Sequence, residues 1–309
     1  MSAIKLGIVG VGKIARDQHL PVIAASADFD LVAAASRNAT VDGVANYPSL
    51  AAMLYAEPSI EAVTLCTPPG PREADAELAL ARGLHVLLEK PPATTLSAAR
   101  DLIARATGQA LHASWHSRHA PGVAPARAWL RGRRIQSITI NWKEDIRRWH
   151  PGQDWILAAG GMGVFDPGIN ALSILTEIVP SNVVLSAAEL DLPRNREAPI
   201  AARLHARTSG GAPIEADFDF LQSGDQTWEI AIDADDGLLR LADGGARLFI
   251  GGEVQAAPSL GRHHEYAGVY SHFAALVRGK QIDVDLRPLE LVADAFTCGV
   301  RNAAPDFEF

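Results

Sequence analysis

The segment LGIVGVGKIA, at residues 6–15, decides the fold of the first part of this chain. Its pattern predicts a buried strand, a tight turn and the start of a helix. Gly10 allows the turn, Gly12 lets the backbone approach a pyrophosphate, and Ala15 takes the small third position that packs helix on strand. Because the unpaired amides of a helix N-terminus attract phosphate, we expect a dinucleotide here rather than an ordinary strand-to-helix turn.

Outward from this segment, short apolar runs alternate with helical patterns up to residue 118. This alternation is typical of βαβ units with a parallel sheet, and it predicts a dinucleotide-binding domain over residues 1–118. The predicted strands are at residues 6–9, 31–35, 62–66, 85–88 and 111–115. The predicted helices lie near residues 14–26, 49–57, 73–82 and 96–106.

The second predicted strand ends in Ser36 and Arg37. Enzymes that select NAD usually place an acidic residue here, to bind the ribose hydroxyls. A hydroxyl and a guanidinium instead suit the 2′-phosphate of NADP, through charge-assisted hydrogen bonds of about 1.5–3 kcal/mol each. The nearest carboxylate, Asp42, comes too late. We expect NADP to be preferred and NAD to be possible; the alternative is that Arg37 is only a surface residue.

Two further strands end in polar residues followed by prolines. Thr67 and Pro68 follow the strand at 62–66, and they either lie along the dinucleotide or simply end the strand. Lys90 follows the strand at 85–88, within the stretch HVLLEKPP. An ammonium at the carboxyl edge of a buried sheet is costly unless it faces a ligand, and the prolines fix the exit of the chain. Lys90 therefore favours an enzyme.

The composition excludes several classes of protein. A length of 309 residues predicts two domains, and a net charge of -8 argues against a nucleic-acid partner. No apolar stretch reaches the roughly 20 residues needed to span a membrane, and no signal peptide is evident. Cys66 and Cys298 are expected to be buried thiols in a reducing compartment. We expect a cytoplasmic protein.

The second part of the chain has a different texture and predicts a separate domain over residues 119–309. Residues 214–220 and 228–233 alternate apolar and polar side chains, which is typical of an antiparallel sheet with one covered face. The predicted turns are glycine-rich, at residues 236–237 and 243–245. A final helix is expected at about residues 289–301, with no strand after it.

Residues 160–170, GGMGVFDPGIN, precede an apolar helix. Asp166 either caps that helix or shares a face with Asn170, and the glycines are expected to let a substrate or nicotinamide ring approach the backbone. Upstream, residues 141–155 carry three tryptophans among charged side chains. Aromatic faces beside hydrogen-bonding groups suit a sugar ring; the alternative is a solvated loop whose tryptophans are anchored in the core.

Histidines gather at the end of the strand predicted at 111–115: His112, His116 and His119, beside Trp115. A zinc site is conceivable, but the spacing fits no common ligand pattern and no cysteine joins it. We therefore expect no metal, and we interpret His116 as a residue of the substrate cleft.

Several strings together resemble the Gfo/Idh/MocA oxidoreductase family across essentially the whole chain, and within it the branch of aldose 1-dehydrogenases that act on L-arabinose and D-galactose. These strings are GKIARDQH at 12–19, EKP at 89–91, WHSR at 115–118, WKED at 142–145, RWHPGQ at 148–153 and FDPGIN at 165–170. The resemblance implies an α/β fold: an N-terminal Rossmann domain with a doubly wound parallel sheet, then an α/β domain with a large, mostly antiparallel open sheet. It also implies hydride transfer between NAD(P) and a sugar, and a homodimer formed through the open sheet face.

The resemblance places Lys90 and Asp166 on the family's catalytic lysine and aspartate, and it implies that the Lys90–Pro91 bond is cis. Many relatives carry a histidine where this chain has Asn170. Because an amide cannot accept the proton of the anomeric hydroxyl, Asp166 or Lys90 must be the base when C1 of a pyranose is oxidised to the aldonolactone; we favour Asp166, with Lys90 and Asn170 stabilising the alkoxide. The candidate cofactor-binding residues are Gly10, Gly12, Lys13, Ile14, Ser36, Arg37, Thr67, Pro68, Glu89 and Lys90. The candidate substrate-binding residues are His116, Glu144, Trp149, His150, Asp166 and Asn170.

Two alternatives stay open. A regulatory protein could bind NAD(P) and sugar without chemistry, although retention of Lys90, Asp166 and Asn170 argues against it. An oxidoreductase on the same scaffold could instead act on another polyol, such as inositol or a dihydrodiol.

Overall fold

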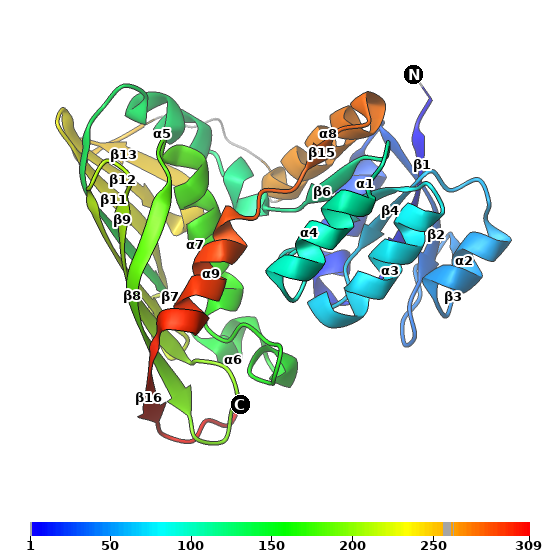
Figure 1. Ribbon diagram of the computed structural model, residues 1–309. Helices are drawn as coiled ribbons and strands as arrows, with labels where there is room; N and C mark the ends of the chain where they lie inside the picture. Colours follow the sequence, from blue (N-terminus) through cyan, green and yellow to red (C-terminus); the bar gives the residue numbers. More distant parts are fainter. Residues whose placement is uncertain (1, 256–260, 262) are drawn as a thin grey trace. The chain divides into compact units, whose positions relative to one another are not determined.

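The computed structural model describes residues 2–255, 261 and 263–309. The chain divides into two compact units (Figure 1). The first holds the described residues of Met1–His116 together with Gly261–Leu286, and the second holds those of Ser117–Leu260 and Arg287–Phe309. The predicted boundary after residue 118 lies near the observed one. The prediction that 119–309 forms one domain differs from this division, because residues 261–286 belong to the first unit.

The first unit contains a seven-stranded parallel sheet in the order β15-β6-β5-β4-β1-β2-β3. Its strands are β1 (Ile4–Val9), β2 (Phe29–Ala35), β3 (Ala45–Tyr47), β4 (Ala62–Leu65), β5 (His85–Leu88), β6 (Leu111–Ala113) and β15 (Ile282–Asp283). The central strands β4 and β5 are short and almost wholly buried, as in parallel sheets covered on both faces. The chain runs from β1 to β2 on one side and reaches β4 on the other, so the carboxyl ends of β1 and β4 flank the point where such sheets bind ligands.

Helices cover this sheet in two groups, with α3 beside α4 and α1 beside α8 (Figure 1). The helices of the first unit are the π-helical turn η1 (Ala15–His19), α1 (Leu20–Ala25), α2 (Leu50–Ala56), α3 (Pro69–Ala81), α4 (Leu96–Arg105) and α8 (His264–Gly279). The helix predicted near 14–26 is thus confirmed as η1 followed by α1. Helix α3 begins at Pro69 rather than at 73, because the fixed φ of proline suits the first position of a helix.

The segment that returns to the first unit contributes both core and sheet. On α8, Tyr270 and Phe273 are 1% and 0% exposed and pack into the apolar cluster around β1. Strand β15 extends the sheet beyond β6, with Ile282 opposite Leu111. No change of composition marks this return in the sequence, which explains why the pattern alone placed it in the second domain.

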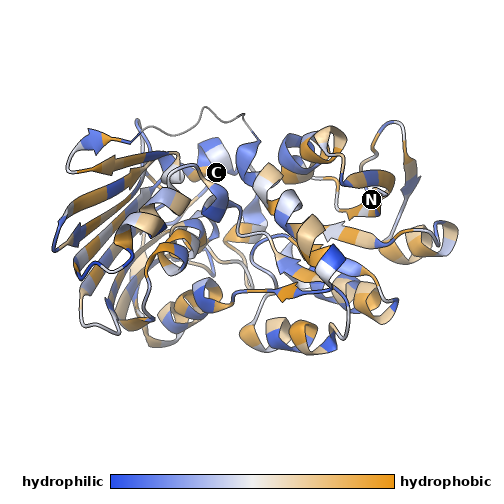
Figure 2. Cartoon of the chain, turned by 90° about the horizontal axis from the view of Figure 1, so that it is seen from above, coloured by the Kyte–Doolittle hydropathy of each residue, from blue (hydrophilic) through white to orange (hydrophobic). Residues whose placement is uncertain are grey.

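The second unit is built on a nine-stranded, mostly antiparallel sheet in the order β14-β13-β12-β11-β7-β10-β9-β8-β16. Its strands are β7 (Ile135–Lys143), β8 (Val183–Pro193), β9 (Ala201–Thr208), β10 (Pro213–Asp219), β11 (Thr227–Ala234), β12 (Gly237–Ala242), β13 (Arg247–Ile250), β14 (Glu253–Val254) and β16 (Val300–Ala304). The period-two alternation predicted for β10 and β11 is confirmed. Figure 2 shows hydrophobic and hydrophilic residues alternating along strands of this sheet.

Helices pack on one face of this sheet, where α7 contacts β7 and β11 and α9 contacts β8. The helical elements are η2 (His116–His119), α5 (Val123–Leu130), α6 (Ile146–Trp149), η3 (Asp154–Ile156), α7 (Phe165–Ile178), η4 (Asp243–Gly245) and α9 (Arg287–Cys298), η2 straddling the division between the units. On the opposite face, the described polar side chains of β10, Glu215, Asp217 and Asp219, are exposed or half-buried.

Two expectations for the C-terminal region are wrong. A strand, β16, follows the last helix and pairs in parallel with β8. Its residues are almost all exposed, so this edge strand lacks the apolar alternation by which strands are found. Cys298 is exposed at the end of α9 rather than buried, while Cys66 is half-buried. None of the helices that the structure describes is long and apolar enough to cross a membrane.

Candidate active site

The turn after β1 has the geometry that a dinucleotide requires. Gly10 has a φ of +86°, and a Cβ there would lie 2.8 Å from the backbone nitrogen of Thr67, so only glycine fits. A Cβ on Gly12 would meet no described atom within 4 Å, which leaves open space beside this backbone. Ala15 is fully buried where the helix packs against the strand. The loop is therefore tightly packed against Thr67 at Gly10 and open at Gly12, which fits a bound pyrophosphate.

Other predicted cofactor contacts surround this loop. Lys13 is exposed and pairs with Asp17, and Ile14 is 36% exposed although apolar. At the end of β2, Ser36 is half-buried and Arg37 is exposed. Sequence reasoning missed Arg16, whose guanidinium donates to the Thr40 carbonyl at 2.9 Å and so ties the helix to the loop that carries Arg37.

Thr67 supplies an independent sign of a ligand. Its Oγ1 is buried and has no hydrogen-bond partner within the described part of the chain. Buried hydroxyls are nearly always satisfied, so an unsatisfied one at the carboxyl end of β4 fits a contact that a ligand completes. Pro68 is exposed next to it, at the start of α3.

Hydrogen bonds fix the backbone on both sides of Lys90. The Lys90–Pro91 peptide bond is cis, as the resemblance implied. The Lys90 backbone nitrogen donates to Glu89 Oε2 at 2.9 Å. Arg72 is buried behind this turn and donates to the carbonyls of Glu89, Pro91 and Thr67. One guanidinium therefore joins the ends of β4 and β5 on both sides of Lys90.

The carboxylate of Glu89 is buried within the first unit, and a cofactor contact by this residue stays a prediction. It is 4% exposed and accepts from the Tyr266 hydroxyl at 2.8 Å and from His19 Nε2 at 2.9 Å. Burial by itself raises the pKa of Glu89, but the hydrogen bond and charge of His19, with the charges of His116 and Arg72, outweigh it and lower the pKa to about 2. The buried, ionised Glu89 carboxylate therefore holds the Lys90 backbone in place through the hydrogen bond from the Lys90 nitrogen.

His116 belongs to the same network. Its Nδ1 lies 2.6 Å from Glu265 Oε2, and its ring stacks on Tyr266 with centroids 5.1 Å apart. His112 lies beside His272 and Asp283, with the candidate ligand atoms of these three residues within 4.8 Å of one another.

In the second unit, Asp166 lies in the first turn of α7 and is 5% exposed. The N-cap residue of this helix is Val164, so the N-cap role considered for Asp166 is wrong. Asn170 follows one turn later and is half-buried. The glycines before Asp166 also differ from expectation. A Cβ on Gly161 or Gly163 would lie 2.2 Å from a backbone oxygen, so these glycines serve close packing of the loop rather than ligand approach.

Two carboxylates flank one imidazole beside α7. His150 Nδ1 lies 4.0 Å from Asp166 Oδ2, and His150 Nε2 lies 3.3 Å from Glu144 Oε1. Glu144 is 5% exposed, and its other oxygen accepts from the indole N–H of Trp228 at 2.9 Å. Both acids are buried around a partly exposed ring, so this cluster is the candidate reactive centre of the second unit.

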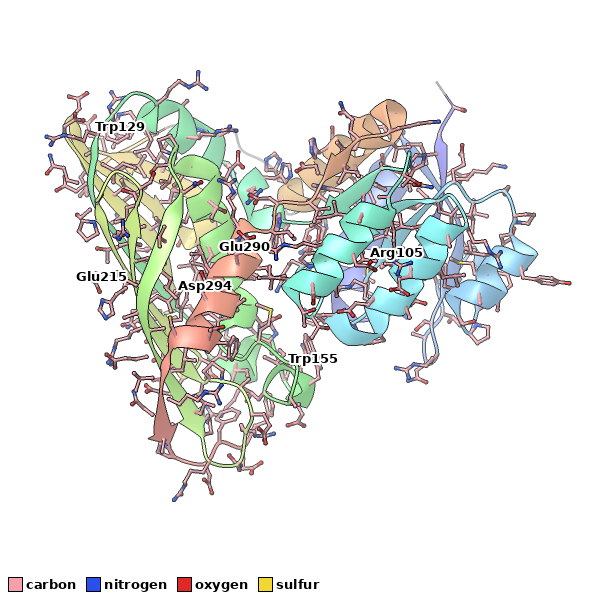
Figure 3. All side chains as sticks on the ribbon, viewed as in Figure 1. Arg105, Trp129, Trp155, Glu215, Glu290 and Asp294 are labelled. Carbon is pink, nitrogen blue, oxygen red and sulfur yellow. The ribbon has the colours of Figure 1, made fainter. Side chains whose placement is uncertain are left out.

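Of the three tryptophans in residues 141–155, one is anchored in the core and two are exposed, as a sugar-binding site would require. Trp142 is 5% exposed and belongs to the core, as the structural alternative required. Trp149 and Trp155 are each 39% exposed, at α6 and η3 (Figure 3 labels Trp155). The Trp149 ring packs edge-on against Trp228, with centroids 5.4 Å apart. The exposed Trp149 indole, which packs on the Trp228 that binds Glu144, fits a sugar-binding surface.

Sequence reasoning missed Trp228 and Gln226. Gln226 Oε1 accepts from the Asp145 backbone nitrogen at 2.5 Å and from Trp149 Nε1 at 3.3 Å, which fixes the turn that carries Trp149. Trp228 stands in an alternating strand and looked like an ordinary sheet residue. Only the register of β11 on β7, which pairs Trp228 with Trp142, brings it next to Glu144.

Comparison with known proteins agrees with this geometry. Residues 4–115 match the model of an oxidoreductase family with an NAD-binding Rossmann fold, GFO_IDH_MocA. The chain is 46% identical over 307 residues to galactose 1-dehydrogenase of Pseudomonas fluorescens, covering 99% of both proteins.

Solved structures give the same result. A D-galactose 1-dehydrogenase protein from Rhizobium etli is 51% identical, with a TM-score of 0.94 over 100% of this chain and 99% of that one. A 3-ketoreductase from Actinomadura kijaniata, solved with NADP and TDP-benzene, is 21% identical with a TM-score of 0.85 over 98% of this chain and 100% of its own, and it shares the fold. The chain belongs to the Gfo/Idh/MocA family of oxidoreductases, whose Rossmann unit binds a nicotinamide dinucleotide.

Proposed function

We propose that this protein is an NAD(P)-dependent aldose 1-dehydrogenase that oxidises C1 of a pyranose such as D-galactose or L-arabinose to the aldonolactone. The observation that carries the proposal is the full-length similarity to the galactose 1-dehydrogenase of Pseudomonas fluorescens. The second unit supports it, because exposed indoles and paired buried carboxylates are the groups that a sugar ring needs.

Each predicted residue then has a role. The bound nicotinamide supplies the hydride acceptor. Asp166 accepts the proton of the anomeric hydroxyl, and Lys90 and Asn170 stabilise the developing alkoxide. Glu144, Trp149, His150 and His116 contact the sugar hydroxyls and ring. Lys90 as the base is the close alternative.

Asp166→Ala tests the assignment of the base. We expect the variant to bind NADP as the wild type does and to lose turnover by about 10²–10⁴-fold, the range that general base catalysis contributes. Initial rates of NADPH formation and a fluorescence titration with NADPH measure the two quantities. Asp294→Ala, an exposed aspartate on α9 that is labelled in Figure 3, is the matched control. Undiminished turnover in Asp166→Ala refutes the assignment.

A substrate panel separates the competing functions. Rates with galactose, arabinose, glucose and xylose are compared with rates on inositol and a dihydrodiol, each with NADP and NAD. Oxidation of a polyol alone would replace the aldose proposal. Sugar and cofactor binding without any turnover would instead identify a regulatory protein.

We infer a preference for NADP from the end of β2. Ser36 and the exposed Arg37 offer a hydroxyl and a guanidinium where NAD-selective enzymes carry an acid. Arg37→Asp should weaken NADP binding by about 10–100-fold, the loss of one charge-assisted contact, with little loss of NAD binding. Equal weakening for both cofactors would show that Arg37 does not recognise the 2′-phosphate.

We also propose that the protein forms a homodimer through the open face of the nine-stranded sheet. Opposite charges alternate across this face, where Lys143 pairs with Asp217 and Arg203 with Glu189, and Glu215 (labelled in Figure 3) lies 2.6 Å from His205 Nδ1. A face that carries both signs in register can meet a copy of itself. Light scattering coupled to gel filtration measures the mass, and charge reversal at Glu215 should shift it towards the monomer. A cytoplasmic location stays a prediction.

A further inference from the structure

This chain has Asn170 where many relatives carry a histidine, so α7 offers no histidine for the aldose oxidation. The chain supplies one from elsewhere, because His150, which follows α6, brings its imidazole to Asp166. In each turnover C1 loses a hydride and the anomeric oxygen loses a proton, so one proton must leave the site. Asp166 is 5% exposed and is poorly placed to deliver a proton to water by itself.

We propose that His150 relays this proton from Asp166 to Glu144 and the solvent. The inference rests on the proposed dehydrogenase function. Asp166 takes the proton from the anomeric hydroxyl and passes it to His150 Nδ1. The imidazolium then loses its Nε2 proton through Glu144 to water, so that Asp166 and Glu144 end as carboxylates and His150 ends as a neutral ring. The proton taken from the anomeric hydroxyl is balanced by the one released to solvent, and exchange of the ring proton with water returns His150 from the Nδ1–H to the Nε2–H tautomer before the next turnover.

The geometry supports this order of transfer. The two ring nitrogens of His150 face different carboxylates, Asp166 at 4.0 Å and Glu144 at 3.3 Å. The first distance is longer than a hydrogen bond, and such contacts commonly tighten when the substrate binds. The His150 side chain is 20% exposed, against 7% for Glu144 and 8% for Asp166, so the ring is the member of the chain that reaches water.

Two aromatic side chains position the His150 imidazole and its partner Glu144 without taking a proton from the ring. Phe220 packs edge-on against the ring at 5.8 Å between centroids. Trp228 donates to the Glu144 oxygen that does not face His150, which fixes the direction of the other oxygen. The titratable groups that the structure records around the ring are therefore Glu144 and Asp166.

His150→Gln and His150→Ala test the relay, with His264→Gln on α8 as a matched control. We expect His150→Gln to lower kcat by about 10²-fold, within the range of general acid–base catalysis, and to leave KM within about threefold of the wild type. The solvent deuterium isotope effect on kcat should rise, because proton transfer becomes limiting. Added imidazole should restore turnover in His150→Ala, whose cavity admits it.

Glu144→Gln gives a second arm that keeps the shape of the side chain. It should lower kcat less than His150→Gln does, while Glu253→Gln, an exposed acid on β14, should change nothing. Circular dichroism and NADPH titration confirm that each variant is folded.

Each outcome decides a separate point. A higher KM with unchanged kcat in His150→Gln would leave His150 with only the sugar contact proposed above, and would overturn the relay. A lower kcat without imidazole rescue or a changed isotope effect would leave only a structural role, and would overturn the relay as well. A wild type that oxidises no aldose would overturn the proposed function itself, and the relay with it.

Discussion

Each unit of the molecule holds a carboxylate cluster that includes a histidine, and the two clusters are built differently. Glu89, in the first unit, is in contact with His19, Tyr266 and the Lys90 backbone, all at 2.8–2.9 Å. His150, in the second unit, stands between Glu144 and Asp166 at 3.3 and 4.0 Å and is partly exposed. Saturated hydrogen bonds fix a conformation, whereas loose contacts beside water leave protons free to move. The first cluster is suited to support and the second to chemistry.

The largest expected effect comes from breaking the first cluster. Glu89→Ala removes a buried charge and leaves His19 and Tyr266 without their acceptor, so it should lower the free energy of unfolding by about 3–5 kcal/mol. Urea denaturation followed by circular dichroism measures the change, with Glu253→Ala as the exposed control. Glu144→Gln, in the second cluster, should cost turnover rather than stability. A stable Glu89→Ala protein would contradict the distinction between the clusters.

Acid should act on the first cluster in a defined pH range. The pKa of Glu89 is about 2 in the folded protein against an ordinary value of 4.5. A lowered pKa means that the ionised carboxylate stabilises the fold above pH 4.5, and that this contribution is lost as the pH falls towards 2. The contribution is about 3 kcal/mol, since one pKa unit corresponds to about 1.4 kcal/mol.

Denaturation of wild type and Glu89→Gln at several pH values measures this contribution. The difference in stability between the two proteins should be constant above pH 4.5 and should shrink below it. A difference that does not vary with pH would show that the Glu89 charge does not stabilise the fold.

The smallest effect sharpens the description of the second cluster. Trp228→Phe keeps the ring that packs on Trp149 but removes the N–H that orients Glu144. We expect turnover to fall by about tenfold or less, because a single hydrogen bond to a charged group contributes about 1.5–3 kcal/mol and only part of it reaches the reaction. Trp129→Phe on α5 is the control. A larger loss would make Trp228 a substrate contact.

The sequence predicted those parts of the site that lie within a few residues of one another. The turn at Gly10 and Gly12, the polar end of β2 and the position of Lys90 after β5 all follow from local patterns, and the structure places each at the carboxyl edge of the sheet. The pairing of Glu144, His150 and Asp166 was anticipated only as a set of sugar contacts, because their distances depend on how α6 and α7 pack.

Partners that are distant in sequence were missed. Glu89 meets His19 across 70 positions and Tyr266 across 177, and nothing in either local pattern announces these contacts. Trp228 reaches Glu144 through strand register, which a one-residue slip would reverse. Residues 261–286 have the composition of any helix followed by a strand, so their membership of the first unit depends on tertiary packing alone.

The return of the chain to the first unit restricts how this protein can be recombined with its relatives. The polypeptide passes between the units after residues 116, 260 and 286. In a hybrid made with a single crossover near residue 118, α8 would come from a different parent than the rest of the first unit. Its side chains would then replace Tyr270 and Phe273, which pack in the apolar cluster around β1. Exchange of cofactor specificity between parents therefore requires the two separate gene segments to be transplanted together.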